Sequence, residues 1–306
     1  AVSVDALPRI AFAHRLRGLA ALIVMLHHYL TFLYAIPEGA ARAINMPFAV
    51  PQDHPTVILL KQLQNRLESF ALDFRMWGHI GVGLFFLVSG FVIPFSLLQV
   101  RERGFLLGRA IRLWPTYAAA LTTILFMLAA ASYAADSPLP FNFGSIIRHL
   151  LLVEDATNGA TLDLVSWSLA VEVIFYLFIA LVAPSLRNGT PMPIITLGFV
   201  PVALATVLPL FIWNDQGLVL LVLARYLSLL PYMLIGVMAN FYYRNQLRLG
   251  LLIGYSAMLF FMFVGSRSLI NLGQARQIDT ACAYFYALLL FVLAYGVRDR
   301  LATLPY

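Results

Sequence analysis

Long runs of apolar residues recur along almost the whole of this 306-residue chain. A helix of about 20 such residues is long enough to cross the hydrocarbon core of a bilayer. The composition agrees, because 61% of the residues are hydrophobic and only 11% are charged, against about 25% charged in soluble domains. The apolar runs are continuous rather than alternating, which disfavours a transmembrane β-barrel. We therefore expect an all-α, polytopic transmembrane helical bundle that forms one domain over residues 1–306.

Eight spans are expected from the apolar runs. They cover approximately residues 15–36, 79–100, 111–133, 165–186, 192–212, 218–243, 249–265 and 280–297. Two long outer connections are expected near 37–78 and 134–164, the first with an amphipathic helix near 56–72 and the second with a short apolar helix near 145–153. The chain begins with Ala1 and stops at Tyr306 just after a charged turn, so we expect it to be truncated at the C-terminus.

The formal net charge of +6 comes almost entirely from arginines, since Lys61 is the one lysine. These arginines collect at the ends of the apolar runs, which indicates contact with membrane lipids and not with nucleic acid. The short loops on the side of the N-terminus have the higher density of arginine, for example Arg101, Arg103 and Arg187. Because basic residues favour the cytoplasmic side, we expect a cytoplasmic N-terminus.

Arg17 and His28 lie in the first apolar run. Eleven residues make three helical turns plus roughly 20°, so both side chains share one helix face about 16 Å apart. His27 lies roughly 80° away from that face, which makes His28 the better candidate for a function. An ionisable group at mid-bilayer depth is usually functional. The alternatives are a lipid-facing anchor for Arg17 and a structural hydrogen bond for His28.

Glu172 lies about two turns inside the fourth expected span. A carboxylate at that depth needs a partner or must stay protonated. A histidine from another helix is a suitable partner, because the carboxylate can orient the imidazole and make it more basic. A neutral, hydrogen-bonded glutamic acid is the structural alternative.

Arg109 and Arg112 are three residues apart at the cytoplasmic end of the third expected span, and positions i and i+3 of a helix face the same way. Two guanidinium groups there suit a ligand rich in phosphate. Contact with lipid headgroups explains the same charges equally well. In the second expected span, Gly81, Gly83 and Gly90 permit close helix packing, and Pro94 removes one backbone hydrogen bond, which requires shelter from lipid.

Four blocks together resemble the acyltransferase 3 family of integral membrane acyltransferases. They are Leu16-Arg17-Gly18-Leu19-Ala20-Ala21 through His28, Gly81-Val82 through Ser89-Gly90-Phe91, Arg109 through Pro115 and Tyr117, and Ser166-Trp167-Ser168-Leu169 through Glu172, Phe175 and Tyr176. Members of this family usually have about ten spans, and a late helix often carries a Ser-Tyr and a histidine. This chain stops before any such segment.

The resemblance implies transfer of an acyl group, often acetyl, from cytoplasmic acyl-CoA to a hydroxyl group. The acceptors of such enzymes are commonly sugars of surface polysaccharides, lipid-linked glycans or secreted small molecules, and the location is the bacterial cytoplasmic membrane. We expect acyl-CoA as a donor co-substrate, no permanently bound cofactor and no metal site. The oligomeric state stays open.

The expected site combines these residues. His28 is the general base and Glu172 its orienting partner. Arg17, Arg109 and Arg112 bind the phosphates of CoA, and the resemblance assigns Ser166, Trp167 and Tyr176 to acceptor binding. A proton-coupled transporter is the alternative function, because buried His, Glu and Arg are also typical of such carriers. However, the sequence contains no clear inverted repeat.

Overall fold

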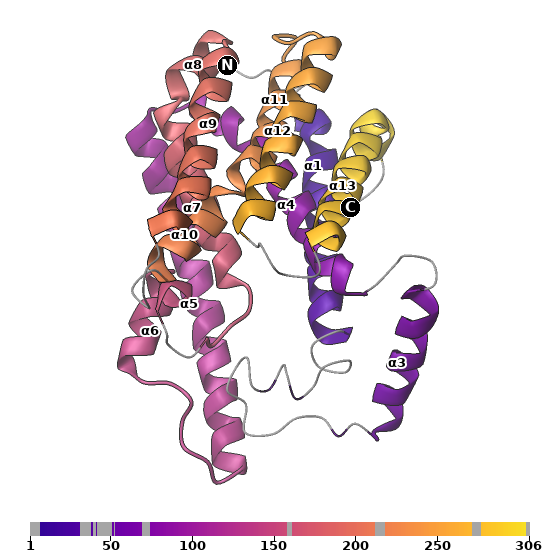
Figure 1. The fold of residues 1–306 in the computed structure, drawn as a ribbon, viewed down its shortest axis with the longest axis vertical. Coiled ribbons are helices and arrows are strands. Elements are labelled where there is room, and N and C mark those ends of the chain that lie inside the picture. Colours follow the sequence, from indigo (N-terminus) through magenta and orange to yellow (C-terminus); the bar gives the residue numbers. More distant parts are fainter. Residues whose placement is uncertain are drawn as a thin grey trace. The chain divides into compact units, whose positions relative to one another are not determined.

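The computed structural model describes residues 7–30, 38, 41, 51, 53–68, 74–157, 161–211, 218–270 and 277–303. Within them the regular structure is helical, without a strand (Figure 1). The elements are α1 (Leu7–His27), α3 (Pro55–Glu68), α4 (Phe74–Leu97), α5 (Glu102–Ala134), α6 (Phe143–Leu150), η3 (Glu154–Ala156), α7 (Ser166–Leu181), α8 (Ala183–Asn188), α9 (Met192–Val207), η4 (Leu208–Phe211), α10 (Leu218–Leu227), α11 (Leu230–Tyr243), α12 (Leu249–Ile270), α13 (Gln277–Gly296) and α14 (Arg298–Thr303). The predicted all-α fold is confirmed.

Five segments of the described chain are long and apolar enough to cross a membrane. They are Met76–Leu97, Glu102–Ala134, Met192–Phe211, Leu218–Tyr243 and Leu249–Ile270. Shorter apolar helices cover Ser166–Leu181 and Thr280–Gly296, and α1 occupies most of the first expected span. Each of the eight expected spans thus coincides with a helix, and the polytopic membrane bundle is confirmed.

The ends of two helices differ from the expectation. α1 begins at Leu7, eight residues before the expected start at position 15, and α5 begins at Glu102, nine residues before position 111. Both extensions contain arginines, which hydropathy assigns to loops although arginine is a good helix former. Residues 31–36 of the first expected span lie outside the described residues.

The sixth expected span is a broken helix. α10 ends at Leu227 and α11 starts at Leu230, with Pro231 in its first turn. Proline lacks an N–H group, so it suits the first turn of a helix and disrupts a helix that runs through it. The run of apolar residues across the break conceals it from a hydropathy analysis, whereas Pro231 marks it.

The chain divides into two compact units, each described by itself. The first comprises residues 1–24, 79–106 and 171–306, and the second comprises residues 25–78 and 107–170. In the first unit, α4 packs closely against two neighbours. A Cβ atom on Gly81 would lie 2.6 Å from Val24 Cγ2 of α1, and one on Gly90 would lie 2.0 Å from the Met233 carbonyl oxygen of α11. The predicted role of these glycines in close packing is confirmed.

Shelter for the backbone around Pro94 comes from α11. The proline leaves the Gly90 carbonyl without its usual helical donor, and the side chain of Asn240 donates a hydrogen bond of 2.8 Å to the next carbonyl, that of Phe91. Asn240 and Phe91 are both completely buried. α4 therefore continues through Pro94 to Leu97 inside protein rather than against lipid.

In the second unit, the expected outer connection at 134–164 folds back along α5. Trp114 Nε1 donates to the Leu150 carbonyl of α6 over 2.9 Å, and Tyr117 Oη donates to Asp163 Oδ2 over 2.9 Å. Tyr117 lies about 25 Å along the helix from Ala134, where the connection starts. The short helix expected near 145–153 is α6, and the amphipathic helix expected near 56–72 is α3. Most of residues 37–54 lie outside the described residues.

Candidate active site

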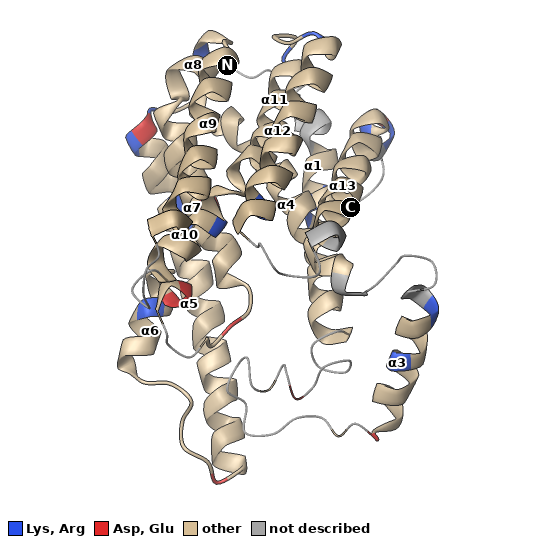
Figure 2. Ribbon diagram, viewed as in Figure 1, with Lys and Arg blue, Asp and Glu red and all other residues tan. Residues whose placement is uncertain are grey.

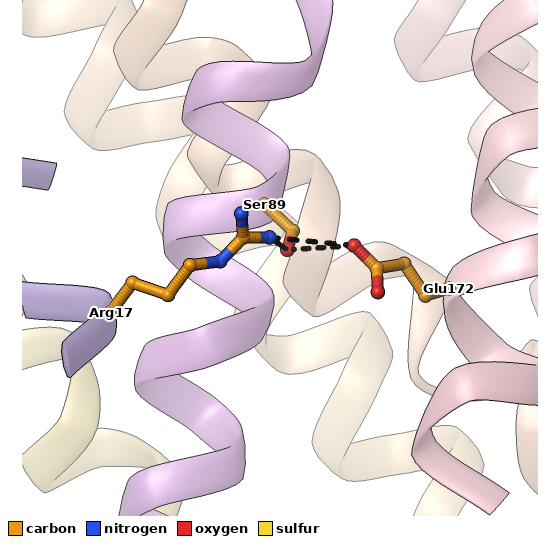
Figure 3. Close-up of polar contacts among 3 residues, drawn as sticks. All are labelled: Arg17, Ser89 and Glu172. Atoms are coloured by element: carbon orange, nitrogen blue, oxygen red, sulfur yellow. Dashed lines mark hydrogen bonds and ion pairs between the residues drawn. The ribbon is translucent and has the colours of Figure 1, made fainter. Parts of the chain in front are cut away.

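Three polar side chains from different helices meet in the first unit (Figure 3). Arg17 of α1 donates through Nη2 to Ser89 Oγ of α4 over 3.0 Å, and the same nitrogen lies 3.5 Å from Glu172 Oε1 of α7. The Ser89 hydroxyl in turn donates to Glu172 Oε1 over 3.3 Å. Ser89 thus links the cation to the carboxylate, and the contacts of Glu172 with Arg17 and Ser89 both fall on one oxygen, Oε1. Figure 3 shows the other carboxylate oxygen, Oε2, pointing away from the pair.

This trio is buried among apolar helices. Glu172 is 4% exposed and Ser89 is completely buried. The guanidinium carbon of Arg17 lies 4.7 Å from the centre of the Phe85 ring, a cation–π contact. Arg17 Nε is buried and has no hydrogen-bond partner among the described residues. Removing one member of a buried ion pair leaves an uncompensated charge, so Arg17 and Glu172 depend on each other.

Arg17 lies further inside its helix than the expected span of 15–36 implies. α1 extends for ten residues before Arg17, which is about 15 Å. Its partner Ser89 lies eight residues before the end of the 24-residue α4. Arg17 therefore lies at the middle of its helix, and its observed partner is Glu172. Binding of CoA phosphate by Arg17 stays a prediction.

His28 follows α1 directly, in a wider π-type turn over residues 28–30. Single π turns of this kind are frequent at functional sites. His28 is half-buried, and its ring lies edge-on to the ring of His27 with 5.3 Å between the centroids. His27 packs close to Gly78, where an added Cβ would lie 2.6 Å from the ring. His28 belongs to the second unit and Glu172 to the first, so their pairing stays a prediction.

Arg109 and Arg112 lie in the first third of α5. They are three residues apart in a continuous helix, as predicted, so their side chains project from one face. Arg112 is exposed and Arg109 is half-buried. An exposed guanidinium can reach a soluble phosphate ligand without displacing packed side chains.

The three residues expected at the acceptor differ in exposure. Ser166 is buried and its hydroxyl hydrogen-bonds to Glu154 Oε1. Tyr176 is also buried, and its ring lies edge-on to Phe105 with 6.0 Å between the centroids. Trp167 is half-buried. Direct contact with a substrate is thus open to Trp167, whereas Ser166 and Tyr176 pack behind the surface. Their acceptor-binding role stays a prediction.

A buried polar cluster in the second unit was not predicted. Asp163 accepts the hydrogen bond from Tyr117 on Oδ2 and caps the start of α7 through Oδ1, which accepts from the backbone N–H groups of Val165 and Ser166. Glu154 is joined to this helix start through the Ser166 hydroxyl. Asp163 three residues before Ser166 is a recognisable N-terminal capping signal that the sequence analysis did not use.

His149 and Glu154 complete this cluster. His149 Nδ1 lies 2.8 Å from the Ser145 carbonyl, and Nε2 accepts from the backbone N–H of Leu162 over 3.0 Å. These partners require a neutral imidazole with its proton on Nδ1. Burial raises the pKa of the Glu154 carboxyl, although the bond from Ser166 opposes this change. Figure 2, in which acidic residues are red, shows few other acidic residues in the helices.

Apolar helices that enclose a buried contact between an arginine, a serine and a glutamate are typical of an integral membrane protein with a polar site inside the membrane. A family model described as an acyltransferase domain matches residues 10–302. The chain belongs to this family, acyltransferase 3, and is a membrane acyltransferase. This membership decides against the transporter that the sequence left as an alternative. No curated protein and no solved structure matched the chain.

Proposed function

We propose that this acyltransferase moves an acetyl group from cytoplasmic acetyl-CoA to a hydroxyl group of a glycan or another extracytoplasmic or lipid-linked acceptor. Family membership over residues 10–302 supports acyl transfer. The observation that carries the proposal further is the buried Arg17–Ser89–Glu172 contact. It holds a guanidinium cation and a carboxylate among apolar helices. Such a low-dielectric site strengthens electrostatic interactions with a reacting group.

In the proposed reaction, His28 takes the proton of the acceptor hydroxyl while its oxygen attacks the thioester carbonyl. The tetrahedral intermediate collapses, the carbon–sulfur bond breaks, and the CoA thiolate receives the proton from His28. The products are an acetyl ester and CoA with a free thiol, so that atoms and charges balance. General-base assistance of this kind is worth about 10² to 10⁴ in rate.

Glu172 supports this chemistry in one of two ways. Its second oxygen, Oε2, can orient the ring of His28 or stabilise its charged form. Its other oxygen is already held by Arg17 and Ser89, which fixes the direction of the carboxylate. Arg17 and Ser89 are therefore positioning residues in this proposal.

Donor binding is assigned to Arg109 and Arg112. Guanidinium groups bind phosphate oxygens in a bidentate manner, and the exposed side chain of Arg112 is accessible from water. A cytoplasmic N-terminus, which the arginine distribution favours, places these residues on the side where acyl-CoA is available. In a bacterium this membrane is the cytoplasmic membrane.

The proposal is tested with purified protein in proteoliposomes, radiolabelled acetyl-CoA and an extract of surface glycans. We expect label to appear in the glycan fraction only with active protein, and alkaline hydrolysis to release it, as for an acetyl ester. Heat-inactivated protein is the control. Absence of labelled glycan with every acyl-CoA offered, or movement of a solute across the bilayer without CoA, would contradict the proposal.

A further inference from the structure

Two arginines in the first unit have no role in the proposed active site. Arg225 is in the last turn of α10, and Arg267 is near the end of α12. α10 and α12 contact each other, and the two guanidinium groups interact electrostatically with one another. Like charges repel, so this arrangement needs a compensating group.

Neither arginine has a counter-ion among the described residues. The ion pairs found there involve Arg17, Arg187 and Arg298. Both Arg225 and Arg267 are half-buried. Arg267 Nε is buried and has no hydrogen-bond partner in the described chain. A charged N–H group without a hydrogen-bond acceptor inside an apolar bundle costs free energy. An anion between the two guanidinium groups would supply this acceptor.

A group of aromatic side chains lies beside Arg267. Tyr284 of α13 is close to Arg267 and is 1% exposed. The Tyr284 ring packs against Phe263 and Tyr232, with centroids 4.8 Å away in each case. Tyr232 Oη donates to the Tyr284 carbonyl over 2.8 Å. These contacts hold α11, α12 and α13 together beside the two cations.

The helix break also lies at this place. Arg225 precedes the interruption between α10 and α11 by two residues, and Ser228 within it bonds through its hydroxyl to the Arg225 carbonyl over 2.7 Å. Broken helices inside a membrane typically occur where the backbone borders a ligand or a polar cavity. This observation is independent of the charges.

We propose that Arg225 and Arg267 form a binding site for an oxyanion, namely a phosphate group carried by a lipid or a soluble phosphate. Two guanidinium groups suit the several oxygens of a phosphate. His79 of α4 contacts Tyr284 at 6.2 Å between ring centroids, so the site is at the end of α4 opposite Leu97. With a cytoplasmic N-terminus this is the extracytoplasmic end. The site does not depend on the acetyl-transfer chemistry.

The test measures ligand-induced stabilisation of the full chain in nanodiscs. One arm compares phosphatidylglycerol, which has a net negative charge, with phosphatidylcholine, whose phosphate is neutralised by its own choline group. The other arm adds inorganic pyrophosphate to phosphatidylcholine nanodiscs. We expect at least one anion to raise the unfolding temperature, and Arg225→Gln or Arg267→Gln to weaken its apparent affinity about tenfold or more. Arg248→Gln is the matched control, since Arg248 is exposed before the other end of α12. Stabilisation by phosphatidylglycerol alone identifies a lipid phosphate, and stabilisation by pyrophosphate identifies a soluble one.

The stability of the proteins without anion gives a second readout. Removing an uncompensated cation should leave the protein in phosphatidylcholine as stable as wild type or more stable. If Arg267→Gln instead lowers the unfolding temperature without anion, an acidic group of the chain neutralises Arg267 and the proposal is wrong. An anion effect that is the same in wild type and both variants would also overturn it.

Discussion

At the scale of single residues, the central contact is the one between Arg17 and Glu172 through Ser89. Neither charged residue is stable alone in an apolar bundle, and together they place a carboxylate at a fixed point inside the membrane. Ser89 contributes both as acceptor and as donor. The energetic dependence between the three residues is therefore measurable separately from activity.

Arg17→Gln and Glu172→Gln should each destabilise the protein because each leaves the other charge buried without its partner. The double variant should lose less than the sum of the two single losses, with a coupling energy of about 0.5–3 kcal/mol. Urea unfolding of the four proteins in a mild detergent measures this. Strictly additive losses would show that the two side chains do not stabilise each other.

Arg109→Gln and Arg112→Gln should weaken binding of CoA by about tenfold each, because each removes a hydrogen bond between charged groups. Titration calorimetry with CoA measures the change. Arg248→Gln is again a suitable control, since it removes an exposed arginine outside this pair. Equal CoA affinity in wild type and the three variants would mean that Arg109 and Arg112 contact lipid and set the membrane orientation instead of binding CoA.

At the scale of elements, α4 is the helix around which the first unit packs. It carries Ser89, and Gly90 on the next position brings its backbone against α11. Gly236 of α11 makes the reciprocal approach, with an added Cβ 2.2 Å from the Leu87 carbonyl oxygen. The position of Ser89 thus depends on two glycines from facing helices.

Gly90→Ala should destabilise the protein by about 1–3 kcal/mol, since the backbone must move to admit the methyl group. Gly254→Ala of α12 is the matched control, because nothing lies within 4 Å of its added Cβ and alanine favours a helix over glycine. Thermal unfolding in detergent compares them. A Gly90→Ala protein as stable as Gly254→Ala would contradict the packing of α4 on α11.

The start of α7 should make stability dependent on pH through Glu154. Burial raises its pKa in the folded state, so the folded protein holds this proton more tightly than the unfolded chain. Its stabilising contribution is fully present below the unfolded pKa of about 4.3 and is lost as the pH rises through the folded pKa. Glu154→Gln should flatten this part of the stability profile between acidic and neutral pH. Identical pH profiles for wild type and variant would exclude this role.

At the scale of the whole molecule, the sequence predicts the fold class and singles out Arg17 and Glu172, but it does not predict that these two residues pair with each other. Apolar runs of sufficient length determine the helical bundle, and Glu172 in such a run must be functional or paired. Helical phase relates Arg17 to His28 but does not say where a helix begins, so the expected first span lacks the eight residues of α1 before position 15. Ser89 is absent from the expected site residues, since nothing in a serine's local sequence shows that a cation will lie beside it. The return of 134–164 along α5 depends on contacts between distant residues such as Trp114 and Leu150.

The most direct test of the proposed function measures a single turnover of labelled acetyl-CoA by wild type, His28→Ala and His27→Ala in proteoliposomes with a glycan acceptor. The two variants remove neighbouring imidazoles, so they separate a specific base from general disturbance of the end of α1. The account predicts that His28→Ala slows formation of the labelled ester by about 10² to 10⁴, while His27→Ala stays within a few-fold of wild type. Transfer by His28→Ala at the wild-type rate would contradict it.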